Sequence, residues 1–226
     1  MSPKTPGMLL RAPRAEDQQE FLDAVRVSRA LHRPWVFPPA TPEAFQAYLR
    51  RNERDDFEAL LACERESGRI AGAFNLSQIF RGGFQNAYLG YWAVHGFEGR
   101  GLMSEALGLV LAHVFRKLKL HRVEANIQPA NLASRALVER AGFRLEGFSP
   151  RYLKVGGRWR DHERWALCRE DWRAHGRPRQ EPRAPNRFVE PQAARRRCSS
   201  MRRWTVSRFW SAQSLRRSKV FFRVPR

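Results

Sequence analysis

The segment from residue 88 to residue 107 restricts the possible folds more than any other part of the chain. An apolar, aromatic stretch with strand character (88–93) runs into a glycine-rich turn (96–101), which leads into a long apolar helical stretch (102–119). The first turn of a helix leaves backbone N–H groups without partners and carries partial positive charge. Gly99 and Gly101 allow close approach to the backbone, and Arg100 adds a fixed cation. The pattern is compatible with a phosphate-binding turn, although alone it is more typical of an ordinary strand-to-helix turn.

The next segment supports a larger alternating α and β unit. Residues 121–128 alternate, with Val123, Ala125 and Ile127 on one face and polar side chains on the other, as in a half-buried strand. A helix is expected to begin at Asn131, a good N-cap, and to end at Gly142, where a left-handed residue is common. The order is therefore strand, glycine turn, helix, strand and capped helix.

Four motifs in this order carry a family resemblance. They are Tyr-Leu-Gly-Tyr at 88–91, Gly-Arg-Gly-Leu-Met-Ser-Glu-Ala-Leu at 99–107, His-Arg-Val-Glu-Ala-Asn at 121–126 and Gly-Arg-Trp-Arg-Asp-His at 157–162. With them the chain resembles the GNAT superfamily of acetyl-CoA-dependent N-acetyltransferases. Within that superfamily it is most similar to the ribosomal-protein-alanine N-acetyltransferases of the RimJ/RimL type. The resemblance covers about residues 8–175 and is strongest between 70 and 170.

The resemblance implies an α+β domain of the GNAT fold over residues 8–175, followed by a basic tail over 176–226. Periodicity and turn signals predict strands at 8–12, 58–66, 69–80, 84–94, 121–128, 143–155 and 158–168, and helices at 16–32, 41–52, 102–119 and from 131. These elements predict a mixed, mostly antiparallel sheet flanked by helices. In the family, the strands corresponding to 84–94 and 121–128 splay apart, and the pantetheine arm of acetyl-CoA lies between them.

The resemblance also implies acetyl-CoA as cosubstrate, without a metal. The pyrophosphate is expected at 99–104, and the thioester near the end of strand 84–94, where a backbone N–H near Val94 would polarise its carbonyl. The expected cofactor-binding residues are Ala93, Val94, Gly99, Arg100, Gly101, Leu102, Met103, Ser104, Asn131 and Ser134.

Acetyl transfer to an amine requires a deprotonated amine and a proton for the leaving thiolate. Many GNAT enzymes carry a tyrosine acid seven residues after the capping asparagine, where this chain has Val138. The resemblance implies Ser134 as the substitute, unless that hydroxyl only satisfies a local backbone group. For the base, Asn126 stands where some relatives have glutamate, and it could position a water molecule. Asp161, with its neighbour His162, is a further candidate, as is Glu105, whose charge also suits a helix first turn.

The missing carboxylate base favours an α-amine acceptor. An α-amino group has a pKa of about 7.7–8.0 and lysine about 10.4, so deprotonating lysine costs about 3 kcal/mol more. The resemblance implies that the acceptor is the N-terminal alanine of a protein, and that this protein is ribosomal. Aromatic residues expected to line the acceptor site are Trp35, Phe37, Tyr152 and Trp159, with Phe80 as a further member.

Charge divides the chain into two parts. Residues 174–226 carry 15 Lys or Arg against 2 Asp or Glu, whereas residues 1–173 carry 27 against 20. The tail interleaves arginine with tryptophan and phenylalanine, which is typical of an RNA-binding arm. The alternative is an extension without function, since Arg outnumbers Lys by 37 to 5, as GC-rich codons give in any reading frame.

Three scattered cysteines, Cys63, Cys168 and Cys198, predict neither a disulfide framework nor a zinc site. No apolar run approaches the roughly 20 residues that span a bilayer, and no secretory signal is expected, so the prediction is a cytoplasmic protein without membrane contact. Two other functions stay open: acetylation of a small amine or antibiotic, and a catalytically silent GNAT domain with an RNA-binding tail.

Overall fold

The computed structural model describes residues 7–175, which form one seven-stranded sheet in the order β1-β2-β3-β4-β5-β7-β6. All neighbouring strands are antiparallel except β4 and β5, which run parallel. The mixed, mostly antiparallel sheet is therefore the one that the sequence predicts. The strands are β1 (Met8–Arg11), β2 (Phe57–Glu64), β3 (Ile70–Phe80), β4 (Asn86–Ala93), β5 (Arg122–Ile127), β6 (Arg144–Val155) and β7 (Arg158–Cys168). The basic tail at 176–226 and Cys198 lie outside the described residues.

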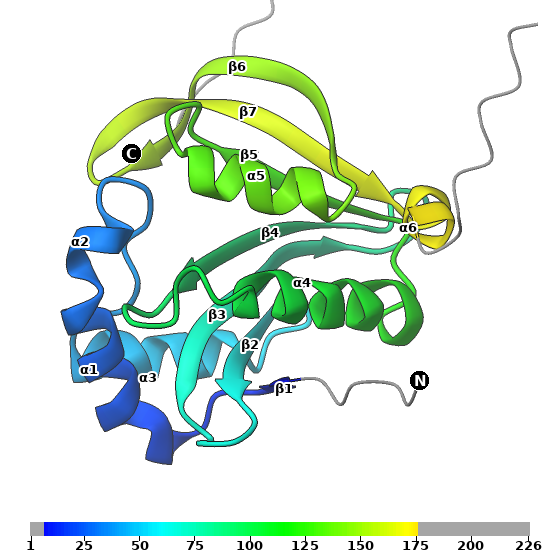
Figure 1. The fold of residues 1–226 in the computed structure, drawn as a ribbon. Helices are drawn as coiled ribbons and strands as arrows, with labels where there is room; N and C mark the ends of the chain where they lie inside the picture. Colours follow the sequence, from blue (N-terminus) through cyan, green and yellow to red (C-terminus); the bar gives the residue numbers. More distant parts are fainter. Residues whose placement is uncertain (1–6, 176–226) are drawn as a thin grey trace, which may run out of the picture. The chain divides into compact units, whose positions relative to one another are not determined.

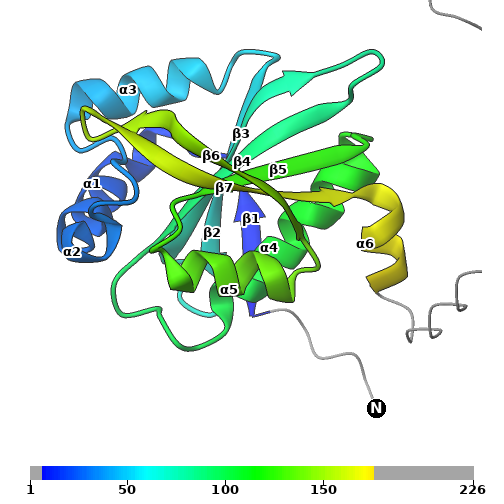
Figure 2. The ribbon, with the colours of Figure 1, turned by 90° about the horizontal axis from the view of Figure 1, so that it is seen from above.

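Helices cover both faces of this sheet (Figures 1 and 2). They are α1 (Gln18–Val27), α2 (Arg29–His32), α3 (Pro42–Arg51), α4 (Leu102–Ala112), α5 (Leu132–Arg140) and α6 (Arg169–His175). Phe21 of α1 packs edge-on against Trp92 of β4, with ring centroids 5.2 Å apart. The neighbouring Tyr91 reaches α5 instead. Because successive strand residues point to opposite faces, α1 and α5 lie on opposite sides of β4.

Local sequence signals fix several helix ends. Thr41 accepts a hydrogen bond from the backbone N–H of Ala44 at 3.3 Å, and Pro42 occupies the first position of α3. Asn131 caps α5 in the same way, accepting from the N–H of Ser134 at 3.1 Å. Gly142 follows α5 with a φ of 89°, the left-handed conformation expected there.

The single helix expected over 16–32 is wrong. The segment forms a short 3₁₀ turn (Ala15–Asp17), α1 and α2, with an interruption at Ser28. The Ser28 hydroxyl donates to the carbonyl of Ala24 at 2.6 Å and accepts the backbone N–H of His95 at 2.9 Å. Back-bonding of this kind competes with the helical ladder, and here it ties the break to the turn after β4.

The helix expected over 102–119 also ends differently. The α-helical part stops at Ala112, and His113–Lys117 forms a π-helical turn. Val114 and Phe115 are buried in this π-helical turn, so the turn still contributes apolar side chains to the hydrophobic core. Cys63 is buried in β2, and Cys168, at the end of β7, is half-buried; both are free thiols.

Candidate active site

β4 and β5 separate soon after they meet. Their parallel pairing ends with Tyr88 opposite Glu124, although β4 continues to Ala93 and β5 to Ile127. The helices α4 and α5 lie on either side of this opening (Figure 1). The splay that the sequence predicts between these two strands is therefore present.

The end of β4 turns backbone groups toward the opening. The N–H of Val94 donates to the carbonyl of Ala71 in β3 at 2.8 Å. Backbone groups alternate between the two edges of an antiparallel strand, so the N–H and C=O of Ala93 face the β5 side. Nε2 of His32 contacts the Ala93 carbonyl at 2.8 Å. The N–H expected to face a ligand near Val94 is therefore that of Ala93.

A cavity of about 590 Å³ occupies the opening; we call it the splay cavity. It is lined from β4, β5, the start of α4, α5 and the segment around α2. Eleven of the site residues expected from the sequence line it: Trp35, Ala93, Gly99, Gly101, Leu102, Met103, Ser104, Asn126, Asn131, Ser134 and His162. Eight do not: Phe37, Phe80, Val94, Arg100, Glu105, Tyr152, Trp159 and Asp161.

The start of α4 is open to an anion. Gly99 and Gly101 have φ values of 71° and 76°, and no atom lies within 4 Å of the position that a Cβ would take at either residue. Gly101 is the N-cap and offers no side chain to the helix, so backbone N–H groups of the first turn can face a phosphate. Arg100 instead binds Glu64 at 2.5 Å and lies over the ring of Phe97. Arg100 is therefore not among the residues that line the splay cavity.

A serine and a tyrosine share a hydrogen bond inside the splay cavity. The hydroxyls of Ser134 and Tyr91 lie 2.5 Å apart, and the Ser134 N–H is held by Asn131. Burial raises the pKa of Tyr91 to about 12, with the hydrogen bond to Ser134 acting in the opposite direction. The phenol therefore keeps its proton at neutral pH and can donate it to the serine hydroxyl.

Two buried histidines line the same cavity. His32 and His162 are each 3% exposed. Burial lowers the pKa of both, against the opposing effect of the backbone carbonyl bound to each ring. His162 contacts the carbonyl of Arg160 through Nδ1 at 2.9 Å. Because a carbonyl only accepts, Nδ1 carries the proton in the neutral ring and Nε2 keeps its lone pair.

The amide of Asn126 completes this wall. Its Oδ1 atom is buried and has no hydrogen-bond partner among the described residues. Buried polar atoms are usually satisfied, so an oxygen left without a partner in a cavity indicates a place for a ligand N–H or a water molecule. The splay cavity thus combines an anion-binding helix start, a strand edge and an unsatisfied amide, and this set fits an acyl-CoA.

Two predicted residues lie behind the cavity wall on the β6–β7 hairpin. Asp161 accepts the backbone N–H of Arg151 at 2.7 Å, at a residue with a φ of 49°. Tyr152 packs its ring edge against His162, with centroids 6.1 Å apart. Both therefore support the hairpin that carries His162. The acidic side chains of Glu163 and Glu124 are also engaged, since Glu163 pairs with Arg135 and Glu124 with Arg122.

Three predicted aromatic residues are exposed. Phe37 covers Gly156, where an added Cβ would lie 2.7 Å from the ring, and it joins the segment after α2 to the β6–β7 turn. Trp159 is 62% exposed, and Phe80 packs on Phe84 at the far end of β3. Within the predicted aromatic set, Trp35 alone contributes to the splay cavity.

Sequence reasoning missed Tyr91 and His32. Tyr91 lies in the Tyr-Leu-Gly-Tyr motif, and strand alternation would have placed it on the same face as Ala93. Position 138 of α5 is a valine, and the tyrosine hydroxyl that contacts Ser134 of α5 belongs to Tyr91 of β4. His32 had no local signal, because its partner Ala93 is 61 residues away.

Among residues 7–175, no group of three or more His, Cys, Asp or Glu side chains is arranged to hold a metal ion. In the same range, no helix is both long enough and apolar enough to cross a bilayer.

Comparison with known proteins agrees with this geometry. The model of the acetyltransferase (GNAT) domain family matches residues 8–144. The chain belongs to this family. A probable N-acetyltransferase of Bacillus subtilis, YjcK, is 38% identical over 127 residues, which cover 56% of this chain and 68% of that protein. The [ribosomal protein uS5]-alanine N-acetyltransferase of Escherichia coli is 42% identical over 103 residues, 46% of this chain and 53% of that enzyme.

Solved structures give the same assignment. RimJ of Mycobacterium smegmatis, in complex with CoA-disulfide, superposes with a TM-score of 0.67 at 27% identity, covering 73% of this chain and 84% of that one. The match to the E. coli enzyme spans about half of that enzyme's length. The GNAT fold, the class of acetyl-CoA-dependent N-acetyltransferase and the cosubstrate expected from the sequence are confirmed. The roles of individual site residues remain predictions.

Proposed function

We propose that this GNAT protein transfers the acetyl group of acetyl-CoA to the N-terminal α-amine of a protein, with alanine as the first residue and a ribosomal protein as the acceptor. The similarity to an enzyme named for ribosomal protein uS5 supports the acceptor class. A ribosomal acceptor would place the enzyme in the cytoplasm, where ribosomes are assembled.

The observation that carries the proposal is the chemistry of the ionisable groups in the splay cavity. Among the described residues that line it, Glu98 is the single carboxylate, and its oxygens accept from His95 and from the N–H of Gly96. The lining also includes the guanidinium group of Arg140, which stays protonated and cannot accept a proton, and the rings of His32 and His162, whose pKa values are lowered by burial. A polyamine site needs free carboxylates to hold its cations, whereas an α-amine with a pKa near 8 needs only a weak neutral base.

Proton transfer divides between two sides of the cavity in this proposal. The attacking amine gives up its proton to Nε2 of His162, directly or through a water molecule held by Asn126. The leaving thiolate takes a proton from the Ser134 hydroxyl, which is replenished by Tyr91. The backbone N–H of Ala93 stabilises the oxygen of the tetrahedral intermediate, and the start of α4 binds the pyrophosphate.

An assay of thiol release from acetyl-CoA by the full-length chain tests the acceptor. The substrates are an alanine-first peptide with the N-terminal sequence of uS5, its N-terminally blocked twin and a polyamine. We expect release with the free peptide only. Release with the polyamine alone would replace the proposal by small-amine acetylation. Binding of acetyl-CoA without release to any acceptor would indicate a silent domain.

The RNA contact suggested for the tail is a separate proposal, since residues 176–226 lie outside the described part of the chain. Its support is the arginine and aromatic composition of that segment. Phosphate contacts give a steep dependence of affinity on salt, so RNA binding of the chain with and without 176–226 between 50 and 200 mM salt tests it.

A further inference from the structure

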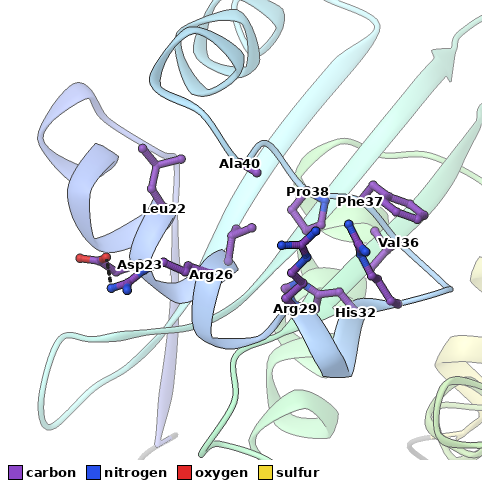
Figure 3. A pocket seen from close by; sticks show the side chains of 11 residues that line it. Leu22, Asp23, Arg26, Arg29, His32, Val36, Phe37, Pro38 and Ala40 are labelled. Carbon is purple, nitrogen blue, oxygen red and sulfur yellow. Dashed lines mark hydrogen bonds and ion pairs between the residues drawn. The ribbon is translucent and has the colours of Figure 1, made fainter. Parts of the chain in front are cut away.

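A second cavity, of about 490 Å³, lies beside the splay cavity. Residues of α1, α2 and the segment 33–40 line it, and His32 and Val36 belong to the walls of both cavities. Figure 3 shows the Asp23–Arg26 ion pair at one end of this cavity, with Arg29 and His32 near the segment 36–38 at the other. We call it the arginine cavity.

Its charge is strongly positive. Arg26, Arg29 and Arg33 follow one another at spacings of three and four residues, and all three line the cavity. Asp23 is the single carboxylate among the lining residues, and it pairs with Arg26 at 2.8 Å. Arg33 lies over the ring of Phe37 at 5.7 Å. Neither Arg29 nor Arg33 has a carboxylate partner among residues 7–175.

The rest of the wall is apolar apart from His32. Leu22, Val25, Val36, Phe37, Pro38 and Ala40 line the cavity beside the arginines. A ligand that fits this wall has a short apolar stem and a terminal anion, because aliphatic carbons pack on these side chains while arginine binds carboxylates through paired N–H donors. Glutamate and aspartate side chains have this form.

We propose that the arginine cavity binds an acidic side chain of the acceptor protein, a few residues after its acetylated N-terminus, through Arg29 and Arg33. The inference rests on the proposed function and adds a substrate preference to it. His32 and Val36 belong to the walls of both cavities, so the two cavities are adjacent, and the residues that follow an N-terminus bound in the splay cavity would cross this shared wall to reach the arginine cavity. The same positive charge repels polyamines.

A glutamate scan measures the preference. An alanine-first host peptide without charged side chains receives Glu at each of positions 2 to 6 in turn, and each peptide has a matched Gln twin. For the full-length enzyme at low salt, we expect one or two positions at which Glu raises kcat/KM over Gln by about five- to tenfold, mostly through KM. Equal values for Glu and Gln at all positions would overturn the inference.

Variants assign the preference to the cavity. In Arg29→Gln/Arg33→Gln, the Glu-to-Gln ratio should fall to about one, and in Arg29→Glu/Arg33→Glu a Lys peptide should be preferred at the same position. Arg54→Gln removes an exposed arginine that pairs with Asp56 outside both cavities, and should keep the ratio of the wild type. A loss of general folding cannot invert a charge preference, so the inversion excludes that explanation. An unchanged ratio in both double variants would overturn the assignment.

Peptide binding separates this inference from the proposed function. If Glu and Gln peptides are acetylated equally, α-amine acetylation stands and the arginine cavity has no such role. If no peptide is acetylated, the anisotropy of fluorescent Glu and Gln peptides with the CoA-bound enzyme still decides the inference. Tighter binding of the Glu peptide that disappears in Arg29→Gln/Arg33→Gln supports it. Equal binding of the Glu and Gln peptides overturns it. Displacement of the fluorescent Glu peptide by an RNA oligonucleotide, but not by an unlabelled Glu peptide, also overturns it.

Discussion

Ser134 and Tyr91 share a hydrogen bond, so removing either hydroxyl should lower kcat. The decrease should be larger for Ser134 than for Tyr91. Removing the hydroxyl in Ser134→Ala takes away the proposed donor to the thiolate, and we expect kcat to fall by about 10²- to 10⁴-fold, the usual contribution of general acid catalysis. Tyr91→Phe keeps the serine but removes its 2.5 Å partner, and a fall of about tenfold is expected. Steady-state kinetics with the alanine-first peptide measures both.

Tyr88→Phe is the matched control for Tyr91→Phe, since Tyr88 lies on the same strand and does not line the splay cavity. It should leave kcat within twofold of the wild type. If Ser134→Ala also stays within twofold, the serine is only an N-terminal residue of α5, which is the alternative that the sequence leaves open.

At the scale of residues, sequence predicts what depends on local signals. Asn131 and Gly142 bracket α5 because capping and left-handed termination are properties of a few neighbouring residues. Arg100, by contrast, was expected to face a phosphate but binds Glu64, 36 residues away. The pairing of Arg100 with Glu64 depends on how the strands are arranged in the sheet, and the sequence of the turn carries no signal for it.

The elements show the same limit at longer range. Periodicity predicts α1 and α2 as one helix, and the structure interrupts it where Ser28 meets the backbone of His95, 67 residues away. The splay between β4 and β5 was inferred from a family resemblance, since alternation identifies each strand but not where their pairing ends. The candidate site lies where β4 and β5 separate and where α2 meets the end of β4. The elements around the site could therefore be predicted from the sequence, but the contacts of Tyr91 with Ser134 and of His32 with Ala93 could not.

Two glycines of the α4 segment should respond in opposite ways to the same substitution. Gly101→Ala forces a Cβ into a residue with a φ of 76°, which should cost about 1–2 kcal/mol of unfolding free energy. The added methyl also occupies the approach to the helix start, so weaker acetyl-CoA binding is expected. Gly108→Ala lies within α4, where the Cβ meets nothing within 4 Å, and should stabilise the protein by about 0.5–1 kcal/mol.

Urea unfolding of both variants, with titration of acetyl-CoA, measures this contrast. Destabilisation by both substitutions would mean that the α4 segment is strained throughout. Unchanged acetyl-CoA affinity in Gly101→Ala would remove the start of α4 from the proposed pyrophosphate site.

For the whole molecule, the buried histidines set the pH at which stability begins to fall. In the unfolded chain a histidine has a pKa of about 6.5. Burial lowers the pKa values of His32 and His162 in the folded state, so between 6.5 and these lowered values the unfolded chain binds protons that the folded chain does not. The free energy of unfolding should therefore be constant just above pH 6.5 and decrease as the pH falls below it.

Carboxylates contribute in a separate and more acidic window. Hydrogen bonds to Arg11 and to the backbone of Arg14 outweigh burial and lower the pKa of Asp17, and the bond to Arg122 lowers that of Glu146. The stability they provide is present above the unfolded values of about 3.9 and 4.3 and is lost as the pH falls through the lowered folded values. A loss of stability between pH 6.5 and 5 is thus assigned to histidines.

Urea midpoints of the full-length chain at pH 7.5, 6.5, 5.5 and 5.0 test this assignment. His32→Gln/His162→Gln should flatten the decrease below pH 6.5, whereas His95→Gln, whose side chain is 69% exposed, should keep it. A wild-type midpoint that stays constant down to pH 5 would show that the two rings are protonated as readily in the folded protein as in the unfolded one. The neutral form of His162 would then rest on the ordinary pKa of histidine alone, and burial would contribute nothing to its proposed role as acceptor of the amine proton.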